Sequence, residues 1–445
     1  MRNIDVNRLI DEARFNRFHW TVLFWCALII VFDGYDLVIY GVVLPVLMQQ
    51  WGLTPLQAGA MGSYALFGMM FGALFFGPLS DKIGRKKAIT LCIILFSGFT
   101  VLNGFTRNPT EFGLCRFLAG LGIGGVMPNV VALMNEYAPK KIRSTLVAIM
   151  FSGYSVGGML SAGLGMLLIP RFGWEAVFFV AGIPLLLLPL IMFFLPESVG
   201  FMIRQGRTAE AVRILKRVEP ALQVQPDDEI ELQMPAIAAA GAPVLQLFRE
   251  GRALRTLSLW VAFFCCLLMV YALSSWLPKM MASAGYGLGS SLSFLLVLNF
   301  GAIFGAIGGG WLGDRLNLPR VLVVFFAIAA LSIGLLGFKS PTPVLYGLIA
   351  LAGATTIGSQ ILLYACTAQF YGLAIRSTGL GWASGIGRNG AIVGPLLGGA
   401  LVGMSLPLQV SFVVFAVPGL VAAIAMTLFC VHQQVTAATV GEALA

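Results

Sequence analysis

Charged residues are scarce in this sequence. Of its 445 residues only 11% are charged, 58% are hydrophobic, and the mean hydropathy is +0.90. Soluble domains carry about 25% charged residues, so this composition excludes a soluble globular protein and indicates a polytopic membrane protein. The 53 glycines fit that class, because small residues let helices approach one another closely in lipid.

Residues for catalysis and metal binding are equally few. The two histidines, His19 and His432, lie at opposite ends of the chain, which argues against an enzyme. All seven cysteines fall in apolar stretches, so we expect neither a disulfide framework nor a metal site. The N-terminus has no short apolar core with a cleavage site, and no removable signal peptide is expected. The formal net charge is +9, but no basic patch with interleaved aromatics is present, which excludes nucleic acid as a partner.

The sequence does contain twelve long apolar stretches, each near the roughly 20 residues that a membrane-spanning helix needs. They run at about 20–46, 58–79, 88–106, 111–135, 144–169, 176–195, 256–281, 290–312, 320–338, 343–369, 377–404 and 408–431. We therefore predict an all-α polytopic membrane protein with twelve transmembrane helices. Its expected parts are a six-helix bundle over 1–195, a central loop over 196–255, a second six-helix bundle over 256–431 and a tail over 432–445.

The distribution of Lys and Arg predicts the orientation. Of 28 basic residues, 22 fall on the side that holds both termini and the central loop. Only Arg107, Arg171, Lys279 and Lys339 fall on the other side. By the positive-inside rule, both termini, the central loop and the tail are expected to be cytoplasmic. The net charge then reflects the lipid bilayer as a partner.

The two halves share an internal repeat. Residues 68–82 align with residues 301–315 at an offset of 233, and both stretches keep their glycines, an aspartate and a basic residue after it. Residues 142–145 recur as 375–378 at the same offset. Duplicated six-helix halves are a transporter architecture, and the substrate site of such proteins is expected where the halves meet.

Four charged residues fall well inside predicted spans, where an ionisable group costs about 2.5–3.5 kcal/mol and marks a functional site. They are Asp33, Asp36, Arg116 and Arg388, and their counterparts in the repeat are Cys266, Met269, Ile349 and Ser155. Asp33 and Asp36 share one helical face with Tyr40, which favours proton handling beside an aromatic contact. Gly34 between them permits close approach of a helix or substrate, or a local break. The alternatives are structural: the aspartates form ion pairs with neighbouring helices, Arg116 bonds to the first-helix backbone or to Asp33, and Arg388 pairs with Asp33 or Asp36.

Several motifs identify a family by resemblance. The stretch GPLSDKIGRKK at 77–87 resembles the loop between helices two and three of the major facilitator superfamily. RFLAGLGIG at 116–124 resembles its fourth-helix motif, and PES at 196–198 resembles the end of its sixth helix. Within that superfamily, DGYD at 33–36 resembles the first-helix motif of the aromatic acid/proton symporters. The wider stretch 33–45 is most similar to bacterial benzoate transporters.

The resemblance implies the major facilitator fold and import of an aromatic carboxylate such as benzoate by proton symport with alternating access. It places the chain in the bacterial cytoplasmic membrane, with protons as the coupling ion, no cofactor and a functional monomer. A symporter of a hydroxybenzoate or another organic anion is the alternative. Substrate binding and proton coupling are expected at Asp33, Asp36, Arg116, Arg388 and Tyr40. An arginine suits a carboxylate because its guanidinium binds bidentately and stays charged.

A second group of residues is expected to form a cytoplasmic gate. By resemblance, Asp81, Lys82, Gly84 and Arg85, with Asp314 and Arg315 of the repeat, latch the two halves in the outward-open state. Charged pairs at that surface can break in water at little cost. The alternative is positive charge retained only for membrane insertion. Glu136 and Glu197 are expected to anchor helix ends at the same surface.

Overall fold

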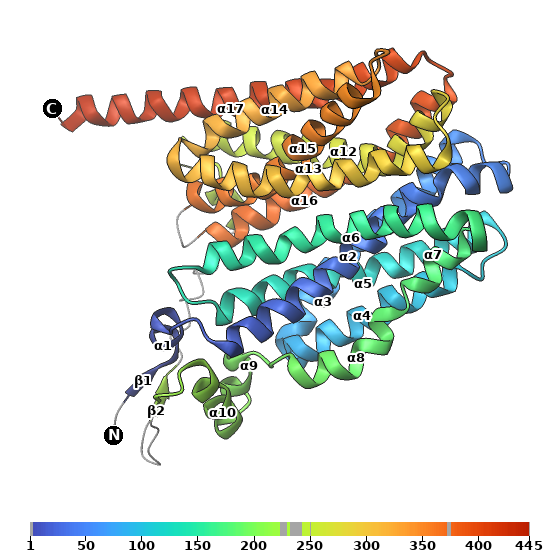
Figure 1. The fold of residues 1–445 in the computed structure, drawn as a ribbon. Coiled ribbons are helices and arrows are strands. Elements are labelled where there is room, and N and C mark those ends of the chain that lie inside the picture. The colour runs from blue at the N-terminus through green and yellow to red at the C-terminus, as the bar shows by residue number, and fades with distance from the viewer. Residues whose placement is uncertain (1–2, 223–228, 232–242, 250, 372–374, 445) are drawn as a thin grey trace. The chain divides into compact units, whose positions relative to one another are not determined.

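The computed structural model describes residues 3–222, 229–231, 243–249, 251–371 and 375–444. Its described residues are mostly helical, as the apolar stretches predict (Figure 1). The spans of the first half are α2 (Arg17–Gln50), α3 (Pro55–Ile83), α4 (Arg85–Asn103), α5 (Pro109–Tyr137), α6 (Arg143–Phe172) and the pair α7 (Glu175–Val180) and α8 (Ile183–Phe194). Those of the second half are α12 (Ala253–Ser283), α13 (Leu288–Arg315), α14 (Leu318–Leu335), α15 (Thr342–Phe370), α16 (Arg376–Gly403) and α17 (Leu408–Leu444).

Every predicted span has a helical counterpart in the structure. Eleven helices of the described residues are long and apolar enough to cross a membrane, with α7 and α8 counted as one. The remaining span is α16, which is equally long but rich in glycine and contains Arg388. The expected fold class, twelve transmembrane helices in two six-helix repeats, is confirmed.

The repeat holds at the level of single atoms. Adding the offset of 233 to the bounds of α5 gives the bounds of α15, and the same shift takes Pro55 at the start of α3 to Leu288 at the start of α13. A Cβ on Gly68 would overlap the carbonyl oxygen of Phe117, and one on Gly301 would overlap that of Ala350, the counterpart of Phe117. Corresponding helices therefore touch at corresponding atoms in the two halves.

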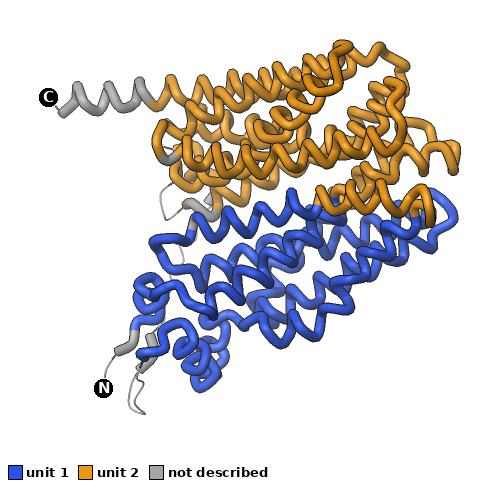
Figure 2. Tube along the Cα trace, in the orientation of Figure 1, with its two compact units in different colours: residues 1–37, 67–157, 175–237 blue, residues 38–66, 158–174, 238–445 orange. Residues whose placement is uncertain are grey.

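Contacts divide the chain into two compact units (Figure 2). Unit 1 contains residues 1–37, 67–157 and 175–237, and unit 2 contains residues 38–66, 158–174 and 238–445. Within unit 2, α12 packs against α16 and α17, α13 against α15, and α14 against α15 and α17. The units group segments by contact and not by repeat, so the boundaries expected at 195 and 256 stay a prediction.

Unit 2 contains a seam between segments of the two halves, which we call the half seam. A Cβ on Gly41 of α2 would overlap the carbonyl oxygen of Ser274 of α12. The hydroxyl of Ser63 on α3 donates a hydrogen bond of 2.7 Å to the carbonyl of Ile392 on α16. Backbones this close leave no room for a ligand, so the half seam is closed in this structure.

The sixth span is broken, whereas the sequence predicted one continuous stretch. Pro184 has no N–H to continue the helical ladder, and the chain turns at Ala181 and Gly182 between α7 and α8. Two carbonyls at the break accept side-chain hydrogen bonds: the hydroxyl of Tyr35 donates to Val177 at 2.7 Å, and that of Ser97 donates to Ala181. A break inside the membrane is tolerated because its backbone groups are satisfied by neighbouring helices.

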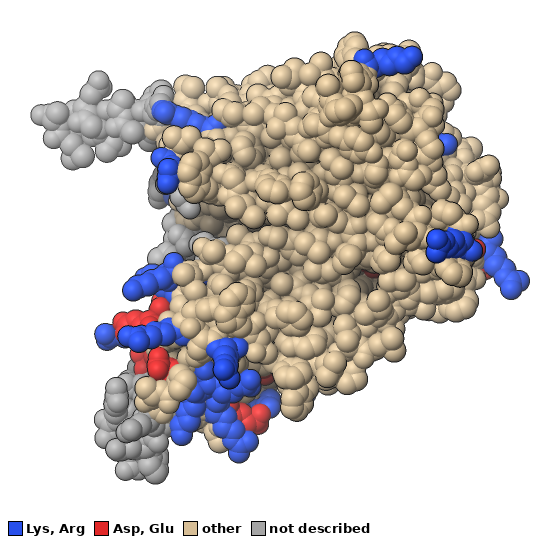
Figure 3. Space-filling view, in the orientation of Figure 1, with Lys and Arg blue, Asp and Glu red and all other residues tan. Residues whose placement is uncertain are grey.

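Outside the spans, the N-terminal segment packs within unit 1. Strand β1 (Asn3–Asp5) pairs in parallel with β2 (Glu229–Glu231), with Ile4 opposite Ile230. Helix α1 (Val6–Glu12) follows, and the central segment adds α9 (Val199–Arg204), α10 (Thr208–Val218) and α11 (Pro243–Gln246). Asp11 forms an ion pair of 2.5 Å with Arg143. Figure 3 shows many Lys, Arg, Asp and Glu side chains gathered near α1, α9 and α10, a broad uncharged surface beyond them and a few more charged side chains at the opposite edge of the view.

Candidate functional site

The centre of the candidate site is an ion pair inside unit 1. Arg116 of α5 donates from Nη1 to Oδ1 of Asp36 on α2 at 2.6 Å, and from Nη2 to the backbone carbonyl of Asp36 at 3.2 Å. Thr100 of α4 donates to Oδ2 of Asp36 at 2.7 Å. Asp36 and Arg116 are each 1% exposed, so three helices hold one carboxylate out of contact with solvent. The structural alternative for Arg116, a bond to the first helix, is thus present, with Asp36 as the partner in place of Asp33.

Asp33 lies one turn before Asp36 on α2 and is fully buried. Between them, a Cβ on Gly34 would overlap the carbonyl oxygen of Tyr154 on α6. The helix continues unbroken through this glycine. Of the three uses expected for Gly34, the structure shows the close approach of a neighbouring helix, which fixes the wall of the site beside both aspartates.

Tyr40 lies further along α2, in unit 2. Its ring packs against Gly62, where a Cβ would come within 2.8 Å of ring atom Cε1, and its hydroxyl donates to the carbonyl of Ala58. These contacts with α3 account for the burial of Tyr40, which is 2% exposed. Its expected contact with an aromatic substrate stays a prediction.

Arg388 lies on α16 in unit 2 and differs from Arg116 in its surroundings. Its side chain is half-buried, and among the described residues it has no hydrogen-bond or ion-pair partner. Its neighbour Gly387 faces α12, where a Cβ would come within 2.7 Å of Leu267 Cδ1.

The first half contains polar residues that the sequence analysis did not single out. Tyr35, Ser97, Thr100 and Asn103 are all buried. Thr100 donates to Asp36, and Tyr35 and Ser97 donate to carbonyls at the break in the sixth span. A comparison of the two halves at the repeat offset would have singled these residues out, because the residue at each corresponding position of the second half is apolar. Tyr35, Asp36, Ser97, Thr100, Asn103 and Arg116 correspond to Leu268, Met269, Ala330, Ile333, Leu336 and Ile349.

The predicted gate residues differ in their exposure and in their contacts. Asp81 and Lys82 are exposed, and the guanidinium of Arg315 lies 4.1 Å from the ring centroid of Trp311. The side chain of Asp314 lies outside the described residues. Gly84 has φ +98°, and a Cβ there would overlap the carboxylate of Glu197. A latch between the halves stays a prediction.

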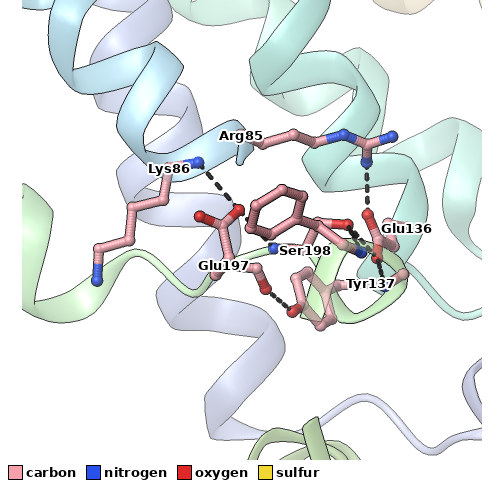
Figure 4. A network of polar contacts seen from close by, with 8 residues as sticks. Arg85, Lys86, Glu136, Tyr137, Glu197 and Ser198 are labelled. Atoms are coloured by element: carbon pink, nitrogen blue, oxygen red, sulfur yellow. Dashed lines mark hydrogen bonds and ion pairs between the residues drawn. The ribbon is translucent and has the colours of Figure 1, made fainter. Parts of the chain in front are cut away.

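Arg85 belongs to a network around Glu136 within unit 1 (Figure 4). Glu136 accepts hydrogen bonds from Arg85 at 2.5 Å, from the Ser198 hydroxyl at 2.9 Å and from the Gly200 amide at 3.0 Å. Glu197 accepts from the backbone amide of Lys86 at 3.2 Å, one of the amides that the start of α4 leaves unpaired. Both glutamates anchor helix ends, as expected, and the network joins α4, α5 and α9.

Potential metal ligands are not grouped in the described part of the chain. Among the residues that the structure describes, no cluster of three or more His, Cys, Asp or Glu side chains could hold a metal ion. The functional groups of the described site residues are carboxylates, guanidinium groups and hydroxyls. Such a set can exchange protons and bind organic anions.

Comparison with known proteins gives a consistent result. Residues 26–388 and 299–442 match the sequence model of the Major Facilitator Superfamily. The benzoate transport protein of Acinetobacter baylyi is 49% identical over 438 residues, which cover 97% of this chain and 94% of that protein. The 4-hydroxybenzoate transporter PcaK of the same organism is 36% identical over 429 residues, covering 95% of this chain and 94% of that one.

Solved structures agree on the fold. The xylose transporter XylE from E. coli, in a partially occluded inward open conformation, superposes with a TM-score of 0.72. The match covers 92% of this chain and 97% of that one, at 16% sequence identity. At this identity the likeness shows the fold alone.

Proposed function

This chain belongs to the Major Facilitator Superfamily, and from that membership we propose that it imports an aromatic carboxylate, benzoate foremost, together with protons by alternating access. Membership makes the chain a membrane transporter and not an enzyme. The benzoate transport protein at 49% identity supports the substrate. The observation that carries the proton coupling is the fully buried Asp36–Arg116 pair.

The pair supports coupling through competition for one guanidinium. While Asp36 is charged, Arg116 and Thr100 occupy both of its oxygens. A proton on Asp36 removes its charge and frees Arg116 for another carboxylate, because an arginine binds a charged carboxylate far better than a neutral acid. Loss of that proton restores the pair and displaces the anion. Either aspartate is a possible carrier, since Asp33 is equally buried on the same helical face.

Arg388 is proposed as the residue that first meets the substrate carboxylate. It is half-buried and has no partner among the described residues, so binding an anion does not require an existing ion pair to break. A bidentate arginine–carboxylate pair also fixes the orientation of a planar aromatic acid. Tyr40 stays a candidate contact for the ring.

The closed half seam supports alternating access. Its contacts involve the second half of α2 and the first half of α3, which by the positive-inside rule lie toward the external side. We infer that the external side is closed in this structure and must separate during the cycle. The proposed location is the bacterial cytoplasmic membrane with both termini inside, and the proposed active form is a monomer that needs no cofactor.

The function is tested by uptake of radiolabelled benzoate into proteoliposomes with an imposed inward proton gradient. Wild type is compared with Asp33→Asn and Asp36→Asn. We expect wild-type uptake to require the proton gradient. We expect both variants to lose gradient-driven uptake, because each substitution removes a buried group that can take up a proton. Wild-type uptake that is indifferent to the gradient would contradict proton symport.

A hydroxybenzoate is the second candidate substrate, because the PcaK transporter of Acinetobacter baylyi covers almost the same length of the chain. Competition of unlabelled 4-hydroxybenzoate with labelled benzoate distinguishes the two. If 4-hydroxybenzoate is taken up and benzoate is not, the proposed substrate class of aromatic carboxylates is retained, but benzoate is not the substrate.

A further inference from the structure

A polar stripe runs along one face of α4 beside the ion pair. Ser97, Thr100 and Asn103 are spaced three residues apart and are all fully buried. Ser97 donates to the carbonyl of Ala181 at the break in the sixth span, and Thr100 donates to Asp36. Within the described part of the chain, neither the oxygen nor the nitrogen of the Asn103 amide has a hydrogen-bond partner. The stripe thus ends on a buried amide that makes no hydrogen bond to any described residue.

Arg116 has a second unpartnered group in the same cluster. Its Nε is buried and makes no hydrogen bond to any described residue, although both terminal nitrogens contact Asp36. Leaving a buried polar group unsatisfied costs about 1–3 kcal/mol, and ordered water normally fills such positions. The amide of Asn103 offers one acceptor and two donors, and Arg116 Nε offers a donor. Water is the ligand that can satisfy both.

The position of Asn103 connects the site to the surface. It is the last residue of α4, and the following turn carries exposed Phe105 and Arg107. Asn103 also lies one helical turn from Thr100, about 5–6 Å between Cβ atoms, which is a gap for one or two waters. The stripe therefore leads from the turn at 104–108 to the carboxylate of Asp36.

The second half shows that the fold does not need this polarity. At the corresponding positions α14 and its end carry Ala330, Ile333 and Leu336, which are 5%, 0% and 2% exposed. The corresponding positions of the second half are thus filled by buried apolar side chains. Ser97 satisfies a carbonyl at a break that the second half lacks, whereas Thr100 and Asn103 have isoleucine and leucine as counterparts, which favours a chemical role for these two polar residues.

We propose that Asn103 and Arg116 hold ordered water beside Asp36, and that this water carries protons between the turn at 104–108 and the Asp36 carboxylate. In each transfer an O–H bond forms at Asp36 while one O–H bond of the protonated water breaks, which leaves neutral water in place. Asn103 is a positioning residue in this scheme. The proposal rests on the proposed proton symport and adds the route by which the proton reaches Asp36.

The test compares three variants in proteoliposomes. Asn103→Leu installs the residue of the second copy, Asn103→Ser keeps a hydroxyl and leaves space for water, and Ser332→Ala is the control. Ser332 is a buried serine of α14 that bonds only to its own helix. Two rates are measured with labelled benzoate: uptake driven by a proton gradient, and exchange of internal for external benzoate at equal pH, which needs no net proton movement. Proton entry is followed with an internal pH dye.

We expect Asn103→Leu to slow gradient-driven uptake and proton entry by about 100-fold, the lower end of the range by which a positioned proton-transfer group accelerates its step. Exchange should stay close to wild type, and Asn103→Ser should recover driven uptake. The proposal is overturned if Asn103→Leu leaves driven uptake unchanged, or if it slows driven uptake and exchange equally. Wild-type protein that shows no gradient-driven uptake would instead contradict the proposed function itself.

Discussion

The Asp36–Arg116 pair can be compared with its counterparts in the second half, because the two corresponding positions there hold Met269 and Ile349. Both of these residues are fully buried, so the packing around them accepts apolar side chains of similar size. Replacing a buried ion pair by well-packed apolar residues is often neutral for stability, whereas removing one partner is strongly destabilising. The chain contains both versions of the arrangement, and only one of them can bind protons.

One single change and one double change should therefore separate the effect on stability from the effect on transport. Arg116→Ile alone leaves Asp36 buried and unpaired, and we expect a loss of about 3–5 kcal/mol in the free energy of unfolding. Asp36→Met combined with Arg116→Ile should recover most of that stability and still not transport. Unfolding temperature in detergent and benzoate uptake are the two measurements. A double variant as unstable as the single one would show that the pair is needed for folding.

Gly84 is a second position where one residue decides local structure. Its φ of +98° disfavours any side chain, and a Cβ there would overlap the Glu197 carboxylate that binds the start of α4. We expect Gly84→Ala to destabilise the protein by about 1–2 kcal/mol, the cost of a left-handed residue with a Cβ. Gly77→Ala is the matched control, because no atom lies within 4 Å of its Cβ. Equal unfolding temperatures for the two variants would contradict this role of Gly84.

At this scale the sequence singled out the charged residues that lie buried in the spans, but it did not give all of their contacts. Asp33, Asp36 and Arg116 were recognisable because charge is rare inside apolar spans. The pairing of Arg116 with Asp36 in preference to Asp33 depends on side-chain direction on α5, which spacing alone does not give. Thr100 and Asn103 were missed because uncharged polar residues are common in membrane helices, and only their apolar counterparts in the repeat set them apart.

Among the elements, spans were easier to predict than their interruptions. All twelve apolar stretches became helices, because a backbone in lipid must satisfy its own hydrogen bonds. The break between α7 and α8 was not predicted. Pro184 lies in a stretch of high hydropathy, and prolines elsewhere in the chain, such as Pro45, stay within continuous helices. What distinguishes Pro184 is the supply of hydroxyls from Tyr35 and Ser97 to the exposed carbonyls.

The half seam gives a prediction about α2 and α12. In Gly41→Val the side chain would occupy the space of the Ser274 carbonyl, so the two helices cannot close as they do here. We expect benzoate uptake to be lost, because one of the two end states of the cycle is blocked. Gly163→Val on α6 is the control, since no atom lies within 4 Å of a Cβ at Gly163.

The accessibility of the half seam provides the readout. A cysteine at Ser275, next to the Gly41 contact, is introduced into a variant whose seven native cysteines are replaced. It should react faster with a membrane-impermeant thiol reagent when Gly41→Val is present than when Gly163→Val is present. Equal reaction rates would mean that the half seam opens no more readily with valine at position 41.

For the whole molecule, the sequence predicted the architecture better than the grouping of its parts. Twelve spans, a repeat with a constant offset and a strong bias of basic charge were sufficient for the fold class. The contact-based units cut across α2, α3 and α6, which each contribute residues to both. No sequence pattern marks this division, because it depends on which half of each long helix meets which neighbour.

Orientation in the membrane is a prediction at the same scale. In the variant without native cysteines, a cysteine at Lys339 should react with an impermeant reagent in intact cells, because that turn is predicted to be external. A cysteine at Lys87 should react only after the cells are permeabilised. Both side chains are exposed, so a difference in reaction reports the side of the membrane and not burial. The reverse pattern would contradict the proposed orientation.

The contacts of the N-terminal segment also have a consequence for the order of assembly. Asp11 pairs with a residue 132 positions later, the Asn16 amide binds the carbonyl of Val218, 202 positions later, and Ile4 lies opposite Ile230. A ribosome adds Val218 and Ile230 only after it has translated every helix of the first half from α2 to α8. The first residues to be synthesised are thus among the last to dock. Their docking marks the moment when the first six spans, with the Asp36–Arg116 pair among them, are complete.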